Sequence, residues 1–149
     1  MKSELRLRGR YDLKLFNGIY LCERQYGDNL IVNTGLNNIA EIFLANSGTP
    51  ARATHIAFGT DATPAAAGQT ALFAEVLTRG GWFSAARASN VLTFIAIYTN
   101  ISGTSPTIQE IGIFNAAAGG AMYSRIVPQK FVFSDGYAVG FTWTVEFGV

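Results

Sequence analysis

The stretch that decides the fold is Val139-Gly140-Phe141-Thr142-Trp143-Thr144-Val145-Glu146-Phe147, near the end of the chain. Apolar side chains occupy every odd position of this stretch, and glycine, threonine or glutamate stands between them. A period of two places successive side chains on opposite faces of an extended strand. The stretch therefore predicts a strand with one apolar and one polar face, on which Trp143 belongs to the core.

Two hairpins are predicted earlier in the chain. Residues 5–15 carry apolar side chains at most odd positions, and Asn17-Gly18 separates them from Ile19-Tyr20-Leu21-Cys22. An Asn-Gly pair supplies the positive φ angles of a two-residue hairpin turn, so we expect the turn at these two residues. A second hairpin is predicted from residues 82–98. Its later strand, residues 91–98, is apolar at both alternating sets, which is typical of a central strand or an oligomer contact.

One segment has helical rather than strand periodicity. Apolar residues recur at helical spacing over residues 36–43, and Asn33 or Thr34 is available to cap the first turn. The rest of the chain divides into eight or nine short strands separated by turn residues, which is typical of sandwiches, jelly rolls and barrels. We predict an all-β fold: a two-sheet antiparallel sandwich, jelly-roll-like, with one short helix near residues 35–45.

Length and composition predict a single domain with a surface suited to protein partners. The chain has 149 residues, within the usual range of one domain. We therefore expect one β-sandwich domain over residues 1–149, with residues 1–9 as an extended N-terminal arm. Only 14% of the residues are charged, against about 25% in typical domains. An uncharged surface of this kind often contacts partners.

The charge balance argues against nucleic acid as a partner, and the lack of a long apolar run argues against a membrane. Eleven Lys and Arg against ten Asp and Glu give a net charge of +1, which provides no field to attract a phosphate backbone. A local basic cluster at Arg6, Arg8, Arg10 and Lys14 is interleaved with Glu4 and Asp12, as on a solvated strand face. No run of about 18 apolar residues and no signal-peptide core occurs in the sequence. We expect a protein made in the cytoplasm.

The inventory of reactive side chains predicts no catalytic site. His55 is the one histidine and Cys22 the one cysteine, which excludes an intrachain disulfide and a cysteine-built metal site. We expect Cys22 to be a small buried group and His55 to be structural. The four aspartates, Asp12, Asp28, Asp61 and Asp135, stand singly beside turn residues. We predict that the protein is not an enzyme and that it has no catalytic residue, cofactor or metal ligand.

Carbohydrate binding would need exposed aromatic platforms. The candidates are Trp82, Trp143, Tyr123 and Tyr137. Trp143 is better explained as core because it shares the apolar set of its strand. Trp82 follows Gly80-Gly81, which favours a flexible rim, and such an aromatic residue could equally anchor a protein interface.

Several segments, in their order and spacing, resemble a group of small virion proteins of tailed bacteriophages. The resemblance covers roughly residues 10 to 147. No single motif is diagnostic, and Phe58 and Ile113 stand where the pattern favours Val and Leu. The segments that carry it are Asn29–Asn37, Ile56–Pro64, Thr70–Leu72 leading to Glu75-Val76, Glu110–Asn115 and Phe141–Phe147.

The resemblance implies a structural protein of the virion and assigns no catalytic residues. Members of the group are capsid decoration (cement) proteins or tail and fibre components. The expected function is that of a decoration protein on the outer capsid surface, which stabilises contacts between capsomers. The expected partners are the major capsid protein or other virion proteins, with a homo-oligomeric dimer or trimer. The alternatives are a tail fibre, baseplate or collar subunit and, from another class, a carbohydrate-binding β-sandwich module.

Two sets of residues are candidates for the protein interface. Arg6 and Arg8 lie in the charged N-terminal segment, which could extend along a neighbouring subunit. Trp82 and Phe83 are candidates for a second, apolar contact.

Overall fold

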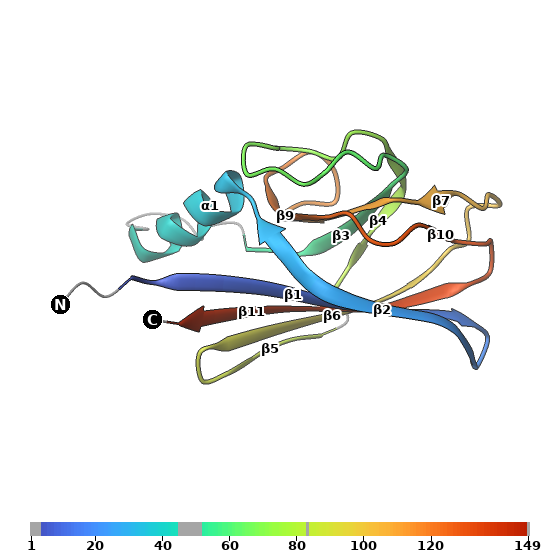
Figure 1. Cartoon of the computed structure of the whole chain (residues 1–149), viewed down its shortest axis with the longest axis horizontal. Helices are drawn as coiled ribbons and strands as arrows, with labels where there is room; N and C mark the ends of the chain where they lie inside the picture. The colour runs from blue at the N-terminus through green and yellow to red at the C-terminus, as the bar shows by residue number, and fades with distance from the viewer. Residues whose placement is uncertain (1–3, 45–51, 83, 149) are drawn as a thin grey trace. The chain divides into compact units, whose positions relative to one another are not determined.

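The protein is all-β with one helix (Figure 1). The computed structural model describes residues 4–44, 52–82 and 84–148. It confirms the all-β class, the short helix and the antiparallel pairing of the strands. The elements are β1 (Arg6–Asn17), β2 (Tyr20–Ile31), α1 (Asn33–Leu44), β3 (His55–Gly59), β4 (Glu75–Gly81), β5 (Ser84–Ala88), β6 (Val91–Thr99), β7 (Thr107–Ile108), β8 (Glu110–Phe114), β9 (Met122–Ile126), β10 (Phe131–Val132) and β11 (Ala138–Gly148).

The chain divides into two compact units. The first comprises Met1–Asn29, Trp82–Ser105 and Phe133–Val149, and the second comprises Leu30–Gly81 and Pro106–Val132. The predicted single domain remains a prediction. Residues 6–9, which were expected to belong to an arm, are part of β1 and pair with β11 from Arg6 opposite Gly148 to Gly9 opposite Val145.

The first unit is an antiparallel sheet in the order β2-β1-β11-β6-β5. Its central pair, β1 and β11, stays in register over eleven residue pairs. One face of the sheet carries the apolar set predicted from the sequence: Leu13, Val139, Phe141, Trp143 and Val145 are each at most 2% exposed. The expectation that Trp143 belongs to the core is therefore confirmed. Its ring lies 5.1 Å from that of Phe94, centre to centre.

The predicted β1–β2 hairpin forms, but its turn lies one residue later than expected. Asn17 pairs with Tyr20, so Gly18 and Ile19 are the two central residues. Gly18 has a φ of 58°, whereas Ile19 has no positive φ. Because only the first central residue is left-handed, the turn is of type II′, in which glycine takes that position.

The expectation that Cys22 is buried is wrong, because Cys22 is exposed. Phe16 pairs with Leu21, whereas Leu15 pairs with Glu23, so Cys22 is an extra residue in β2. Such a bulge leaves one residue unpaired and bends the strand. The alternation of the sequence could not reveal it.

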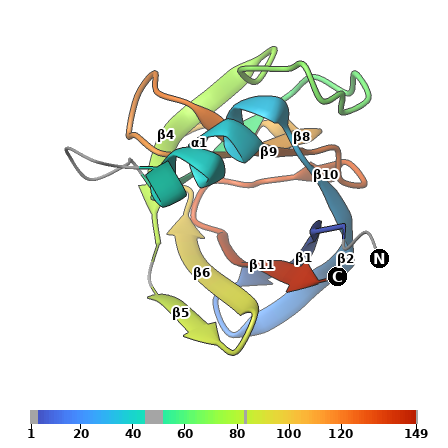
Figure 2. The same ribbon diagram turned by 90° about the vertical axis from the view of Figure 1, so that its left-hand side faces the viewer.

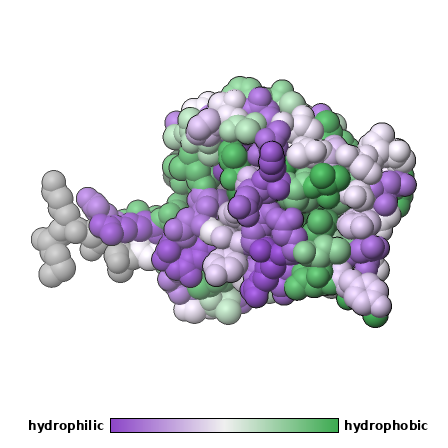
Figure 3. All heavy atoms as spheres, turned by 45° about the vertical axis from the view of Figure 1, so that its right-hand side comes forward, coloured by the Kyte–Doolittle hydropathy of each residue, from purple (hydrophilic) through white to green (hydrophobic). Residues whose placement is uncertain are grey.

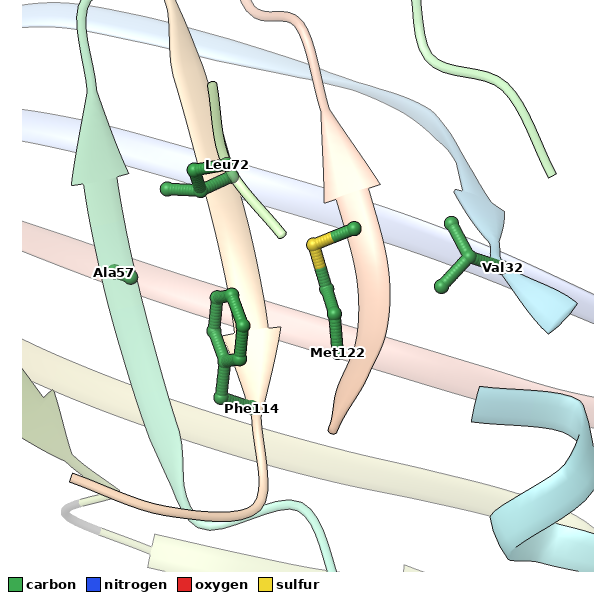
Figure 4. Packing of buried hydrophobic residues seen from close by; sticks show 5 residues of the cluster. All are labelled: Val32, Ala57, Leu72, Phe114 and Met122. Carbon is green, nitrogen blue, oxygen red and sulfur yellow. The ribbon is translucent and has the colours of Figure 1, made fainter. Parts of the chain in front are cut away.

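The second unit combines helix α1 with the strands β4-β3-β8-β9. The last two residues of β2, Leu30 and Ile31, pair with β9. Strands β8 and β9 are buried along their whole length. Figure 4 shows a cluster of buried side chains from strands β3, β8 and β9 and from two connecting segments: Val32, Ala57, Leu72, Phe114 and Met122.

Helix α1 contacts β9 in the second unit. The helix begins at Asn33, two residues before the predicted start, and its described part ends at Leu44. Thr34 Oγ1 donates a hydrogen bond to the Met122 carbonyl oxygen at 2.5 Å. Gly35 lies so close to β9 that a β carbon there would collide with the backbone of Tyr123. A glycine in the first turn therefore allows the helix and the strand to approach closely.

Candidate functional site

A groove on the first unit is lined in large part by charged side chains. It has a volume of about 570 Å³. Its lining comes from neighbouring strands of the sheet, because even-numbered residues of β1, β2 and β11 project from one face. The lining residues are Arg8, Arg10, Tyr11, Asp12, Arg24, Tyr26, Gly27, Asp28, Thr142 and Thr144.

Two ion pairs organise the charges of the groove. Arg24 donates to both carboxylate oxygens of Asp12, from Nε at 3.2 Å and from Nη2 at 2.6 Å. Arg8 likewise reaches both oxygens of Asp28, at 3.1 and 3.4 Å from Nη2. The hydrogen bond from Asp12 and its charge raise the pKa of Arg24 above its usual value. Paired in this way, the guanidinium groups are held at fixed positions on the sheet.

Of the three arginines that line the groove, Arg10 lies farthest from its carboxylate partner among the described residues. Its Nε lies 3.8 Å from Asp28 Oδ1, and its side chain is 51% exposed. Tyr26 stands beside the pairs with 74% of its surface exposed, and the Arg24 guanidinium carbon lies 5.6 Å from its ring centre. An exposed ring beside fixed donors and acceptors is suited to a polar ligand that has one flat apolar face.

A second candidate surface is the tip of the β1–β2 hairpin. Ile19 is 89% exposed, Tyr20 is 73% exposed and Leu21 is 53% exposed. Ile101, in the loop after β6, is 86% exposed. We call these four residues the apolar end. The face drawn in Figure 3 has hydrophobic patches beside a broad hydrophilic area.

The apolar end is placed by hydrogen bonds at one end of the sheet. Phe16 pairs with Ala138, and Ala138 pairs with Thr99, so the turn of the hairpin and the loop after β6 lie at the same end. Asn17 Nδ2 donates to the Tyr137 hydroxyl at 3.2 Å, and the Asn100 amide donates to the Tyr137 carbonyl oxygen at 2.9 Å. Tyr137 thus connects the two segments.

The loop that follows β6 is rigidly held. Asn100 is fully buried, and its side-chain amide donates to the carbonyl oxygens of Thr104 and Phe133 at 2.8 and 2.7 Å. Its Oδ1 accepts from the amide and the hydroxyl of Ser102 at 3.1 and 2.7 Å. Because the loop is held by these bonds, Ile101 is presented on a fixed backbone.

The second unit contains a buried charge pair. Arg125 and Glu110 are both 0% exposed, and Arg125 donates to Glu110 Oε2 from Nη2 at 2.9 Å and from Nε at 3.0 Å. Glu110 also accepts from the backbone amides of Phe73 and Ala74 at 3.1 and 2.7 Å. Asp61 lies 3.7 Å from the same guanidinium. These contacts connect the loop between β3 and β4 to strands β8 and β9.

The same loop is fixed at its beginning by Asp61. The Thr63 amide donates to Asp61 Oδ1 at 2.8 Å. Hydrogen bonds from Thr63, with a smaller contribution from the charge of Arg125, lower the pKa of Asp61 below its usual value. Sequence analysis predicted Asp61 as a turn former, and this local bond agrees with that role. We interpret the Arg125 cluster as structural, because its guanidinium group is enclosed and paired.

The predicted interface residues do not form one site. Arg6 is in β1 with its side chain 78% exposed, 3.9 Å from Glu4. Arg8 lines the groove. Trp82 is half-buried and stacks against Trp143 at 6.5 Å between ring centres, rather than standing on an open rim. Phe83 lies outside the described residues.

The exposed aromatic residue of the groove, Tyr26, was not among the candidates predicted for carbohydrate binding. Trp143 and Tyr123 are 2% and 3% exposed. Burial raises the pKa of Tyr123. Tyr26 is the exposed ring instead. A signal was present in the sequence, because Arg24, Tyr26 and Asp28 are polar or aromatic at alternate positions, but their neighbours on β1 depend on the register of the hairpin.

Within the described ranges, no group of three or more His, Cys, Asp or Glu residues is arranged to hold a metal ion. His55 Nδ1 lies 2.8 Å from Thr54 Oγ1, a local contact. The one described helix is too short to cross a membrane. Comparisons of the chain with protein families, with curated proteins and with solved structures found no match.

Proposed function

We propose that this protein is a structural subunit of a bacteriophage virion, and specifically a capsid decoration protein. In this proposal it binds the outer capsid surface through the apolar end and stabilises contacts between capsomers. The supporting observation is the exposure of Ile19, Tyr20 and Leu21 at the end of a paired two-stranded hairpin. Exposed apolar side chains at a protruding tip are suited to a hydrophobic pocket on a protein partner.

The mechanism is the repetition of a modest contact. A decoration subunit that buries about 800 Å² on its own surface would form an interface of standard size. Many copies on one shell add their contacts, so a moderate affinity at each site reinforces the whole particle. The net charge of +1 suits an outer position, because an inner subunit would face packaged DNA. The proposal involves binding and no catalysis.

The experiment is co-sedimentation with empty capsids assembled from the major capsid protein encoded with this chain. The wild-type protein should sediment with the capsids, and Ile19→Asp should reduce its occupancy at least tenfold. Ile19 is 89% exposed, so the substitution should leave the thermal unfolding temperature unchanged. Leu5→Asp is the matched control, since Leu5 is 65% exposed but lies before β1. Absence of wild-type binding would refute the decoration function.

Copy number in the purified virion distinguishes the decoration role from the tail role. Hundreds of copies per particle indicate decoration, and a handful indicates a tail fibre, baseplate or collar subunit. The interface predicted at Arg6 can be tested in the same assay by Arg6→Ala. Deletion of residues 1–9 is less suitable, because residues 6–9 pair with β11 and their loss would damage the sheet.

A second candidate function, carbohydrate binding, is favoured by one observation. The groove brings the exposed ring of Tyr26 next to two bidentate Arg–Asp pairs. Fixed planar groups can bind neighbouring sugar hydroxyls, while the ring stacks on the apolar face of a sugar. On a glycan array, this function predicts saturable binding that Tyr26→Ala abolishes and Tyr20→Ala preserves. An array without any saturable signal would exclude it.

A further inference from the structure

The free side of strand β5 is an unusual feature of the first unit. In the part of the chain that the structure describes, β5 is the last strand of the sheet and pairs on one side only, with β6 (Figure 2). All five of its residues, Ser84-Ala85-Ala86-Arg87-Ala88, are exposed. An open edge with small side chains is a template on which another strand can pair.

In the larger described sheet, the open sides of β4 and β2 are protected, unlike that of β5. In β4, the pairing to β3 shifts between Ile56 and Phe58, and Leu77 has a φ of 65°. Such an irregularity twists an edge away from a potential partner. The free side of β2 carries charged residues over 23–28. Strand β5 has neither a bulge nor a proline, and Arg87 is its one charged residue.

The hairpin geometry shows which backbone groups are available on this edge. Ala88 pairs with Val91 across the two-residue turn, so the backbone groups of Ala88 point toward β6. Alternate residues point the opposite way. The N–H and C=O groups of Ala85 and Arg87 therefore face the open side.

We propose that β5 pairs with β5 of a second copy of this chain, antiparallel and with the two-fold axis at Ala86. In this register Ala85 of one copy lies opposite Arg87 of the other, and each such pair exchanges two backbone hydrogen bonds. Ser84 lies opposite Ala88. The backbone N–H and C=O groups of Ala85 and Arg87, which face the open side in each copy, all form hydrogen bonds in this arrangement. The five-stranded sheets of the two copies then form one continuous sheet.

Charge and size support a second copy as the occupant. About this axis Arg87 faces an alanine and meets no like charge, whereas a shift of two residues could place the two Arg87 side chains opposite each other. Arg87 Nη1 donates to the Ser89 carbonyl oxygen of its own chain at 2.9 Å, so the side chain is folded along its own hairpin. The alanine side chains are small, so no bulky group on either face of β5 obstructs the approach of a second strand. This inference is independent of the virion proposal.

The first test uses charges at the two-fold axis. In sedimentation equilibrium the wild-type mass should rise toward that of two chains as the protein concentration increases. Ala86→Lys places two positive charges directly opposite each other and should weaken the dimer at least tenfold. Ala88→Lys is the matched control: it lies on the same strand face, but its two copies are roughly 13 Å apart along the strands, at 3.3 Å per residue. An equimolar mixture of Ala86→Lys and Ala86→Glu should regain the dimer.

The second test is oxidative cross-linking in a Cys22→Ser background, which removes the exposed native cysteine. Ala86→Cys places two thiols in a non-hydrogen-bonded pair with Cα atoms about 4.5 Å apart, within disulfide range. Ser84→Cys on the same face should not cross-link, because its two copies lie four residues apart in this register. A monomeric wild-type protein at millimolar concentration, equal effects of Lys at positions 86 and 88, or equal cross-linking of the two Cys variants would overturn the proposal.

Discussion

Glu110→Gln should strongly destabilise the second unit, because it discharges one member of a fully buried ion pair. Glu110 Oε2 accepts two bonds from Arg125 and one from the Phe73 amide, while Oε1 accepts from the Ala74 amide. A glutamine keeps the shape but replaces one oxygen by an NH₂ group, which must face one of these donors. Breaking a buried pair from one side costs about 3–5 kcal/mol. Asp61, at 3.7 Å from Arg125, compensates in part, so we expect about 3 kcal/mol.

Urea denaturation followed by circular dichroism measures this loss. For a chain of this size the thermal midpoint should fall by about 10 °C. Hydrogen exchange at the Phe73 and Ala74 amides should also accelerate, because their acceptor is weakened. Asp28→Asn is the control: Asp28 pairs with Arg8 on the surface with 68% of its side chain exposed, and its loss should cost less than about 1 kcal/mol. Equal losses for the two variants would refute the reasoning that burial makes the Glu110 pair indispensable.

Three further predictions concern stability. Gly35→Ala should cost about 1–3 kcal/mol by overpacking, although alanine is the better helix former, because the added carbon collides with the backbone of β9; Gly68→Ala, which has no neighbour within 4 Å, should be nearly neutral in the same urea titration. Asn100→Ala should cost about 1–3 kcal/mol, since it leaves the buried carbonyl group of Phe133 and the partly buried one of Thr104 without this donor. The pKa of Asp61 in the folded protein is below its ordinary value of 3.8, so the ionised carboxylate stabilises the fold above the unfolded pKa, and this contribution is lost as the pH falls through the folded pKa. The difference in unfolding free energy between the wild type and Asp61→Asn should therefore be constant from pH 7 to about pH 5 and should shrink below pH 3.8. A difference that persists at low pH would contradict this assignment.

Local patterns predicted the strands whose alternation is complete. Residues 139–147 alternate strictly, and β11 buries Val139, Phe141, Trp143 and Val145. The helix was predictable from its spacing, within two residues at its start. Residues 91–98 were less clear: their double apolar pattern predicted coverage of both faces, yet Ile97 is 59% exposed. The alternative interpretation of this strand, an oligomer contact, stays a prediction.

The register of the β1–β2 hairpin could not be predicted from the sequence. Asn17-Gly18 correctly indicated a turn, but type I′ would centre it on residues 17–18, whereas type II′ centres it on residues 18–19, and this moves the partner of each β1 residue by two positions along β2. The bulge then places Cys22 outside the alternation. The groove depends on this register, because it determines that Tyr26 lies opposite Asp12 and that Asp28 lies opposite Arg10. The individual charges were visible in the sequence, whereas their pairing required the fold.

The buried pair of the second unit was unpredictable for a different reason. Glu110 and Arg125 are 15 residues apart on β8 and β9, and each stands in an apolar segment. A charged residue among apolar ones in a strand is usually assigned to the solvent face. Here both strands are buried, so each charge requires the other, and only the pairing of Gly112 with Arg125 and of Glu110 with Gly59 brings them together.

The three surfaces of the first unit are separated well enough to be tested independently. The groove is formed on β2, β1 and β11, whereas β5 lies two strands away from β11 in the order of the sheet. The apolar end lies at the turn of the β1–β2 hairpin and in the loop after β6. Substitutions at Ile19, Tyr26 and Ala86 share no described contact, so their effects should be additive. The antiparallel β5 pairing reverses the strand direction of the second copy, so the two apolar ends lie at opposite ends of the joined sheet. Ala86→Lys should therefore leave capsid binding unchanged, and a loss of binding in this variant would contradict the separation of the two surfaces.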